Sequence, residues 1–179
     1  YAHNITPAHM LWYPASMGPT HMDDCPFCPA GTTPSESNYC CQGYNFGTQA
    51  GGGFPAGSFT GMFGRTAHAI RMAEVTDGLS NTWMVGETLP SHCTFMGMFS
   101  QNFPTSGTGI PLGTMEDRGV GKPEEGQKWY RSCGYKSLHP AGANFALGDA
   151  SVRFVMREID YKLYNNLGTR AGGESASVP

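Results

Sequence analysis

Residues 143–155 decide the fold; they run Ala143-Asn144-Phe145-Ala146-Leu147, then Gly148-Asp149-Ala150, then Ser151-Val152-Arg153-Phe154-Val155. Apolar residues alternate with other residues on both sides of the central glycine: Phe145 and Leu147 come before it, Val152 and Phe154 after it. Such alternation is typical of strands that bury one face, and the Gly-Asp pair between them indicates a tight turn. The stretch therefore predicts a β-hairpin with one buried face.

A short helix is predicted directly after the hairpin. Ile159, Leu163 and Leu167 recur every four residues, which places them on one stripe of a helix. Asp160 carries the negative charge that is favoured in a first helical turn. Gly168 stands where a left-handed residue would end the helix.

A buried strand is predicted upstream of the hairpin, over residues 82–87, which run Thr-Trp-Met-Val-Gly-Glu. The run is apolar and rich in β-prone residues, and it follows a turn signal at Thr76-Asp77-Gly78. A strand, a hairpin and a short helix in this order predict an α+β domain with an antiparallel β-sheet.

The composition indicates that long loops connect these elements. The chain has 179 residues, of which 25 are glycine and 13 are proline, about a fifth of the total. Charged residues make up 14% and aromatic residues 12%, a balance that favours a folded core over a disordered chain. We expect one loop-rich globular domain, and the composition excludes a helical bundle, a coiled coil and a collagen-like rod.

The net charge of −3 excludes two classes of partner. The sequence has no basic stripe, so we expect no nucleic-acid partner and no attraction to an anionic membrane. It also has no apolar run of about 18 residues, so we expect no membrane contact by the chain as given.

The cysteines predict a domain stapled by disulfides in an oxidising compartment. Adjacent cysteines point in different directions in extended backbone, so Cys40 and Cys41 are expected to bond to separate partners. Zinc binding by Cys25-Pro-Phe-Cys28 with Cys40-Cys41, or a redox role for that first pair, remains an alternative. The six disulfide candidates are Cys25, Cys28, Cys40, Cys41, Cys93 and Cys133.

Two stretches are expected to be irregular. Residues 1–62 contain seven prolines and the glycine run 51–53, which together interrupt every candidate periodic segment. Asn4 opens an N-x-Thr sequon and Thr33 lies in a Thr-Thr-Pro-Ser run, so both are glycosylation candidates. Residues 91–128 also have loop composition, and a loop of that length usually serves function or assembly.

Several residues could carry chemistry or bind an ion. His139 and Asp149 could act as base and orienter, although the simpler interpretation makes Asp149 a turn residue and His139 a packing residue. Asp77, Asn81 and Asp149 supply oxygen ligands of the kind that calcium prefers. For Glu87 we expect a structural salt bridge to Arg153 or Arg170. The sequence contains no lipase-type serine motif, no zinc-protease motif and no phosphate-binding loop.

Several of these segments together resemble a known family. In the C-terminal part, nine residues separate His139 from Asp149, and Ala150 follows where the family has the glycine of an Asp-Gly pair. This spacing is similar to the signature of a large prepilin-like family of unknown function that is expanded in planctomycete-type bacteria. The resemblance covers residues 37–174, carried by Ser37-Asn38-Tyr39, residues 61–65, 76–82, 84–87, 139–145, 151–154 and 168–174.

The resemblance implies the architecture of a type IV pilin or pseudopilin: a cleaved leader, a long apolar N-terminal helix and an exported globular head. The sequence lacks that helix, so we expect a head whose helix is processed away, absent from the sequence or dispensable. We therefore divide the chain into residues 1–36, an irregular assembly arm, and residues 37–179, the pilin-like head. Pseudopilin heads as a class use calcium, but the family supplies no active site.

The leading hypothesis is a non-enzymatic structural subunit of an extracellular filament or surface assembly, with copies of itself as partners and no cofactor other than calcium. The alternative is a carbohydrate- or surface-binding module. A third hypothesis is a metal-dependent hydrolase centred on His139. The stacking platforms of the binding module would be Trp12, Tyr13, Trp83, Trp129 and Tyr130.

Overall fold

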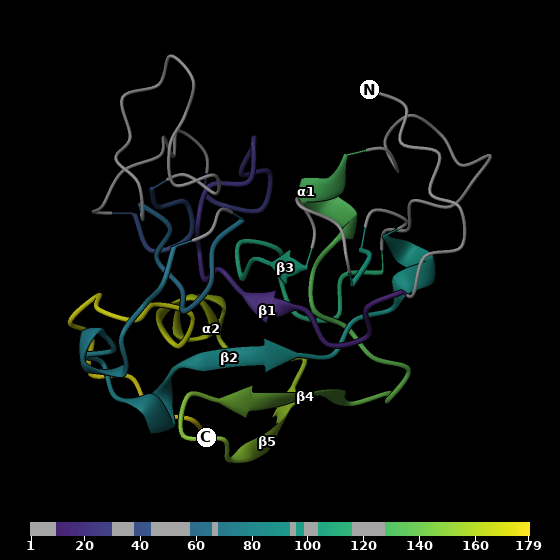
Figure 1. The fold of residues 1–179 in the computed structure, drawn as a ribbon. Helices are drawn as coiled ribbons and strands as arrows, with labels where there is room; N and C mark the ends of the chain where they lie inside the picture. Colours follow the sequence, from purple (N-terminus) through teal and green to yellow (C-terminus); the bar gives the residue numbers. More distant parts are fainter. Residues whose placement is uncertain are drawn as a thin grey trace.

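A five-stranded β-sheet forms the centre of the computed structural model, with the strand order β3-β1-β2-β4-β5 (Figure 1). The strands are β1 (Ala15–Ser16), β2 (Trp83–Gly86), β3 (Thr105–Ser106), β4 (Gly142–Leu147) and β5 (Val152–Met156). The helices are α1 (Trp129–Ser132) and α2 (Tyr161–Asn166), with three 3-10 turns, η1 (Met72–Glu74), η2 (Leu79–Asn81) and η3 (Pro90–His92). The structure describes residues 10–29, 38–43, 58–65, 68–93, 96–98, 104–115 and 128–179.

The predicted hairpin is confirmed as β4 and β5, which pair antiparallel along their whole length. Asp149 shapes the turn between them, because its Oδ1 accepts hydrogen bonds from the backbone N–H and the hydroxyl of Ser151. Ala150 adopts a left-handed backbone conformation with φ of 67°. That conformation suits glycine better than a residue with a Cβ.

The buried face of β5 differs from our prediction. Phe145 and Leu147 of β4 are buried, but on β5 the buried residue is Val155, whereas Val152 and Phe154 are exposed. The register explains the difference, since Ala143 pairs with Val155 and therefore places it on the core face. The two faces of β5 carry Val152, Phe154 and Met156 on one side and Arg153 and Val155 on the other, so alternation favoured the face that the structure exposes.

The sheet is mixed rather than wholly antiparallel, which corrects the predicted topology. β1 pairs antiparallel with β2, through Ala15 and Val85, but parallel with β3, through Ala15 and Thr105. A parallel pair requires a long connection, and the chain between β1 and β3 provides one. Ala15–Ser16, from the segment that we assigned to an irregular arm, thus lies inside the sheet.

The main core lies between the sheet and α2 (Figure 1). The ring of Trp83 packs on Phe145 with centroids 4.7 Å apart, and its indole N–H donates to the carbonyl of Tyr164 at 3.1 Å. Burial of large side chains such as these contributes roughly 1.5–3 kcal/mol each. The buried core side chains are those of Trp83, Leu112, Tyr135, Ala143, Phe145, Leu147, Val155, Tyr164 and Leu167.

The predicted helix is confirmed as α2, although its end is not built as expected. Asp160 caps the N-terminus, because its Oδ1 accepts a hydrogen bond from the Leu163 N–H at 2.8 Å. Gly168 is absent from the residues with positive φ, so the predicted left-handed end is wrong. Packing requires the glycine instead, because a Cβ at residue 168 would lie 2.7 Å from the Thr108 hydroxyl oxygen.

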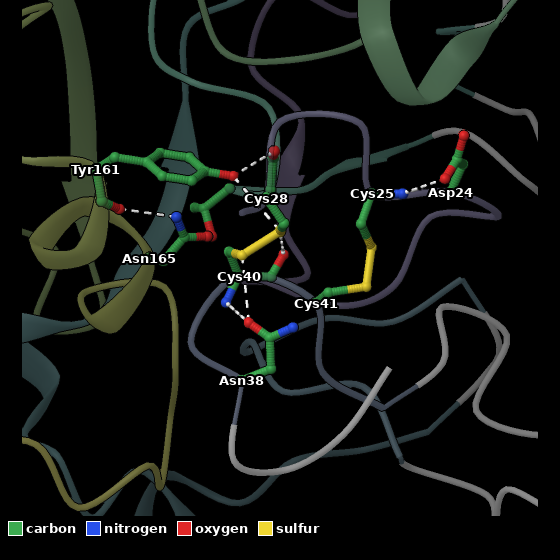
Figure 2. Close-up of a disulfide and its surroundings, with 10 residues drawn as sticks. Asp24, Cys25, Cys28, Asn38, Cys40, Cys41, Tyr161 and Asn165 are labelled. Atoms are coloured by element: carbon green, nitrogen blue, oxygen red, sulfur yellow. Dashed lines mark hydrogen bonds between the residues drawn. A yellow bond between two sulfur atoms is a disulfide. The ribbon is translucent and has the colours of Figure 1, made fainter. Parts of the chain in front are cut away.

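The predicted disulfides are confirmed, and the adjacent cysteines do bond to separate partners. Cys25 bonds to Cys41 and Cys28 bonds to Cys40, so that two bridges lie side by side (Figure 2). The third bridge joins Cys93 and Cys133 inside a second core cluster, which also includes Met17, Met22, Met96, Ile110 and Trp129. Such stapling is typical of proteins from oxidising compartments.

In the ranges that the structure describes, no helix has the length and apolarity needed to cross a membrane.

Candidate functional site

The carboxylate of Glu87 is the charged group at the centre of the candidate site. Glu87 directly follows β2, and the β2–β4 register, which pairs Gly86 with Phe145, brings it beside Asn144. Its Oε2 accepts from the Asn144 backbone N–H at 2.8 Å and its Oε1 from the Asn144 side-chain amide at 3.1 Å. The Glu87 backbone N–H in turn donates to the Asn144 carbonyl at 3.1 Å, so the two residues hold each other in place.

These contacts keep Glu87 ionised. Burial alone would raise the pKa of the carboxyl group. The hydrogen bonds from Asn144 and Ser137, together with the charge of His139, outweigh that effect and lower the pKa below its ordinary value. The site therefore carries a negative charge at neutral pH.

A cavity of about 160 Å³ opens beside this carboxylate. Three chain segments meet around it, held by backbone hydrogen bonds from the Thr88 N–H to the Trp12 carbonyl (2.8 Å) and from the Lys136 N–H to the Glu87 carbonyl (2.9 Å). Trp12, Tyr13 and Leu138 are exposed by 56%, 58% and 82%. The lining residues are Trp12, Tyr13, Glu87, Thr88, Leu89, Ser137 and Leu138.

The aliphatic hydroxyl groups of the lining, those of Thr88 and Ser137, already have partners in the protein. The Thr88 hydroxyl donates to the Gly134 carbonyl at 2.8 Å. The Ser137 hydroxyl bonds to Glu87 and also accepts from the His139 backbone N–H at 3.2 Å. The cavity therefore offers mainly apolar surface and one negative charge.

His139 and Asp149, the signature pair, have different surroundings. The His139 ring meets the Phe154 ring edge to face, with centroids 6.1 Å apart, and its charge acts on Glu87. Asp149 is committed to Ser151 in the hairpin turn, and these hydrogen bonds lower its pKa. Asp149 thus has the turn role of our simpler interpretation, while the carboxylate near His139 is that of Glu87.

The salt bridge that we predicted for Glu87 is wrong. The Arg170 guanidinium donates to the backbone carbonyls of Phe59 and Gly61. Arg153 donates to the carbonyl of its neighbour Val152. Both arginines satisfy backbone oxygens instead, because the sheet register places Asn144 rather than a cation beside Glu87.

Comparison with protein families places the chain. A family model described as "protein of unknown function (DUF1559)" matches residues 6–162. The chain belongs to the DUF1559 family. No curated protein and no solved structure shows a significant match.

The DUF1559 match extends further toward the N-terminus than the prepilin-like resemblance described above. That resemblance began at residue 37, whereas the DUF1559 match begins at residue 6 and therefore includes Trp12 and β1. The match also contains Glu87 and Asn144. The whole candidate site consequently lies in the part that this chain shares with DUF1559.

Of the three residues that we predicted as calcium ligands, Asp77 and Asp149 have carboxylates that accept hydrogen bonds within the protein. Asp77 accepts from the backbone N–H groups of Gly172 and Gly173, at 2.7 and 2.9 Å. Asn81 contributes its backbone N–H to Gly78 in the same turn. Asp149 is bonded to Ser151, as described above. Calcium binding by these residues remains a prediction.

One cluster in the described part of the chain has the spacing of a metal site, and it consists of His21, Cys25 and Cys41. Its ligand atoms all lie within 4.8 Å of one another. Both cysteines form the Cys25–Cys41 disulfide, so their sulfurs are not the thiolates that zinc requires (Figure 2). The disulfide interpretation of this segment therefore replaces the zinc alternative for the oxidised protein.

The aromatic residues divide into two groups. Trp83 is fully buried and Trp129 nearly so, with its indole N–H donating to Asp23, so neither can be a stacking platform. Tyr130 is partly buried against the second core cluster. Trp12 and Tyr13 alone of the predicted platforms are strongly exposed. The glycosylation candidates Asn4 and Thr33 lie outside the described residues.

Proposed function

We propose that this chain is a structural subunit of an extracellular assembly, a pilin-like head that pairs with copies of itself through the outer face of β5. The observation that carries this proposal is the row of apolar side chains on that face. Val152, Phe154 and Met156 are exposed by 60%, 46% and 53%, and they alternate along one strand. Contiguous exposed apolar patches of this kind mark interaction surfaces.

The position of β5 strengthens the argument. β5 is the last strand in the sheet order, and in the described part of the chain only β4 pairs with it. Soluble proteins commonly protect a sheet edge with charge, proline or a covering segment, because its free backbone groups can pair with another chain. Arg153 is the charged residue within β5, and it lies between apolar neighbours.

Two further features fit an extracellular structural role. Three disulfides constrain a loop-rich chain, which suits a protein that must persist outside the cell. The resemblance to prepilin-like proteins implies export and assembly.

Sedimentation and electron microscopy of the protein from its native source test the proposal, together with a charge inserted into the patch. Phe154→Lys should shift the protein toward monomers, because the buried apolar contact would be replaced by an ammonium group. Met72→Lys is the control, since Met72 is also an exposed apolar residue but lies on η1. Monomers at every concentration would contradict the subunit role. If Phe154→Lys assembles like the unmodified chain, the outer face of β5 is not the assembly interface.

A further inference from the structure

The cavity beside Glu87 has the chemical character of a cation site. Of its lining residues, Trp12, Tyr13, Leu89 and Leu138 are apolar or aromatic, and Glu87 is the charged one. Aromatic faces attract cations through their quadrupole, and the attraction grows when the cation loses its water. The carboxylate of Glu87 at the same cavity adds a full negative charge opposite the positive charge of such a ligand.

Glu87 retains its charge for such a ligand. Its hydrogen-bond donors, Asn144 and Ser137, are both neutral, so neither cancels the negative charge. His139 contributes a coulombic effect without a hydrogen bond to the carboxylate. Asn144 and Ser137 therefore orient the carboxylate and keep it ionised, and a positive ligand would find it preorganised.

The same lining disfavours a sugar. A carbohydrate site needs donors and acceptors free to bond to several hydroxyl groups, because buried polar groups must be paired. In this cavity the Thr88 hydroxyl is committed to Gly134, and the Ser137 hydroxyl to Glu87 and His139. The remaining surface is mainly apolar, which suits methyl and methylene groups around a charge.

We propose that this cavity binds an alkylammonium group, with Trp12 and Tyr13 contacting its carbon atoms and Glu87 its charge. A volume of about 160 Å³ corresponds to roughly five water molecules in the liquid, a space that suits a compact cationic head group. The lining of the cavity includes no residue of β5, so the site is distinct from the proposed assembly face.

Titration of the full chain with choline tests the site. Tryptophan fluorescence and calorimetry measure the binding. Trp12 is the exposed reporter, whereas Trp83 and Trp129 are buried. Choline should bind, and 3,3-dimethylbutan-1-ol, which has the same shape without the charge, should bind at least tenfold more weakly. Equal binding of the two compounds, or no binding of any cation, would overturn the proposal.

Three variants separate the site from general effects. Glu87→Gln should weaken choline binding at least tenfold, whereas Glu158→Gln, which removes an equal charge from an exposed residue elsewhere, should leave it unchanged. Trp12→Ala tests the site if Glu87→Gln fails to fold. Because Trp12 is exposed, this variant should fold, and loss of the indole ring should abolish choline binding. Choline binding that survives both Glu87→Gln and Trp12→Ala would overturn the site.

Two additional ligands identify the source of the ammonium group. Nα-acetyl-lysine methylamide represents a lysine side chain of a protein partner, and choline represents a free quaternary ammonium compound. Tighter binding of the lysine analogue assigns the site to a protein side chain, and tighter binding of choline assigns it to a small molecule. A neutral disaccharide that binds more tightly than either cation would overturn the proposal in favour of a sugar site.

Discussion

Glu87 and Asn144 form a reciprocal pair: the carboxylate accepts from the backbone and side-chain N–H groups of Asn144, and the Glu87 N–H donates to the Asn144 carbonyl. The pair joins the end of β2 to the middle of β4. It therefore fixes the position of a charged group through hydrogen bonds from a neutral residue, at a junction between two strands.

The pair makes stability depend on pH in a defined direction. The folded-state pKa of Glu87 lies below its ordinary value, so its contribution to stability is present above that ordinary value and is lost as the pH falls through the folded pKa. Urea unfolding between pH 7 and pH 3 should show a steeper loss of stability for the unmodified chain than for Glu87→Gln. Parallel pH profiles for the two proteins would contradict the prediction.

Asn144→Ala tests the side-chain half of the pair. It removes the hydrogen bond from the amide and leaves the one from the backbone, so we expect a loss of about 1 kcal/mol. The pKa of Glu87, followed by carbon-detected NMR, should rise toward its ordinary value. An unchanged pKa would show that the backbone hydrogen bond alone holds the carboxylate ionised.

Ala150→Gly should stabilise the protein. Ala150 has φ of 67°, a conformation that costs an L-residue roughly 1 kcal/mol more than glycine. The free energy of unfolding should therefore rise by about 1 kcal/mol in urea denaturation. Ala171→Gly is the control, because Ala171 is exposed and is absent from the residues with positive φ, and it should bring no gain.

The three disulfides should contribute unequally. Cys93–Cys133 closes a separation of 40 residues, whereas Cys28–Cys40 closes 12. The loop-entropy model gives about 4 kcal/mol for the longer loop and about 3 kcal/mol for the shorter one. Replacing both cysteines of each bridge by alanine and comparing thermal unfolding checks the order, and a larger loss for the shorter loop would contradict it.

Gly168→Ala should destabilise the protein through crowding rather than backbone strain. The added Cβ would lie 2.7 Å from Oγ1 and 3.0 Å from Cγ2 of Thr108, and overpacking of this kind costs roughly 1–3 kcal/mol. Thr108→Ala removes both atoms, so Gly168→Ala should cost less in that background. Equal costs in the two backgrounds would show that the Asn165 carbonyl, 3.0 Å from the same Cβ, is the source.

The sequence predicted the local elements well because each carries its own periodic pattern. Apolar spacing and turn residues predict the strand at 82–87, the hairpin and α2 from the sequence. The exposed face of β5 was mispredicted, since Val152, Phe154 and Val155 are all apolar and only the pairing with β4 decides which is buried. β1 and β3 have two residues each, too few for any periodic signal.

The candidate site was predicted only in part, for the same reason. His139 and Asp149 share a sequence signature, but the partner that the structure brings near His139 is Glu87, about 50 residues upstream. Asn144 beside Glu87 follows from the β2–β4 register, which no local pattern contains. The exposure of Trp12 and burial of Trp83 likewise depend on tertiary packing.

The position of β1 between β3 and β2 has a consequence for how the chain folds. Both sides of its strand are paired only when Ala15 meets Val85 and Thr105, which lie far later in the sequence. Folding rates fall when native contacts join residues far apart in sequence. β1 is thus expected to complete its pairing late in folding, and a chain that stops short of residue 104 leaves the β3 side of β1 unpaired.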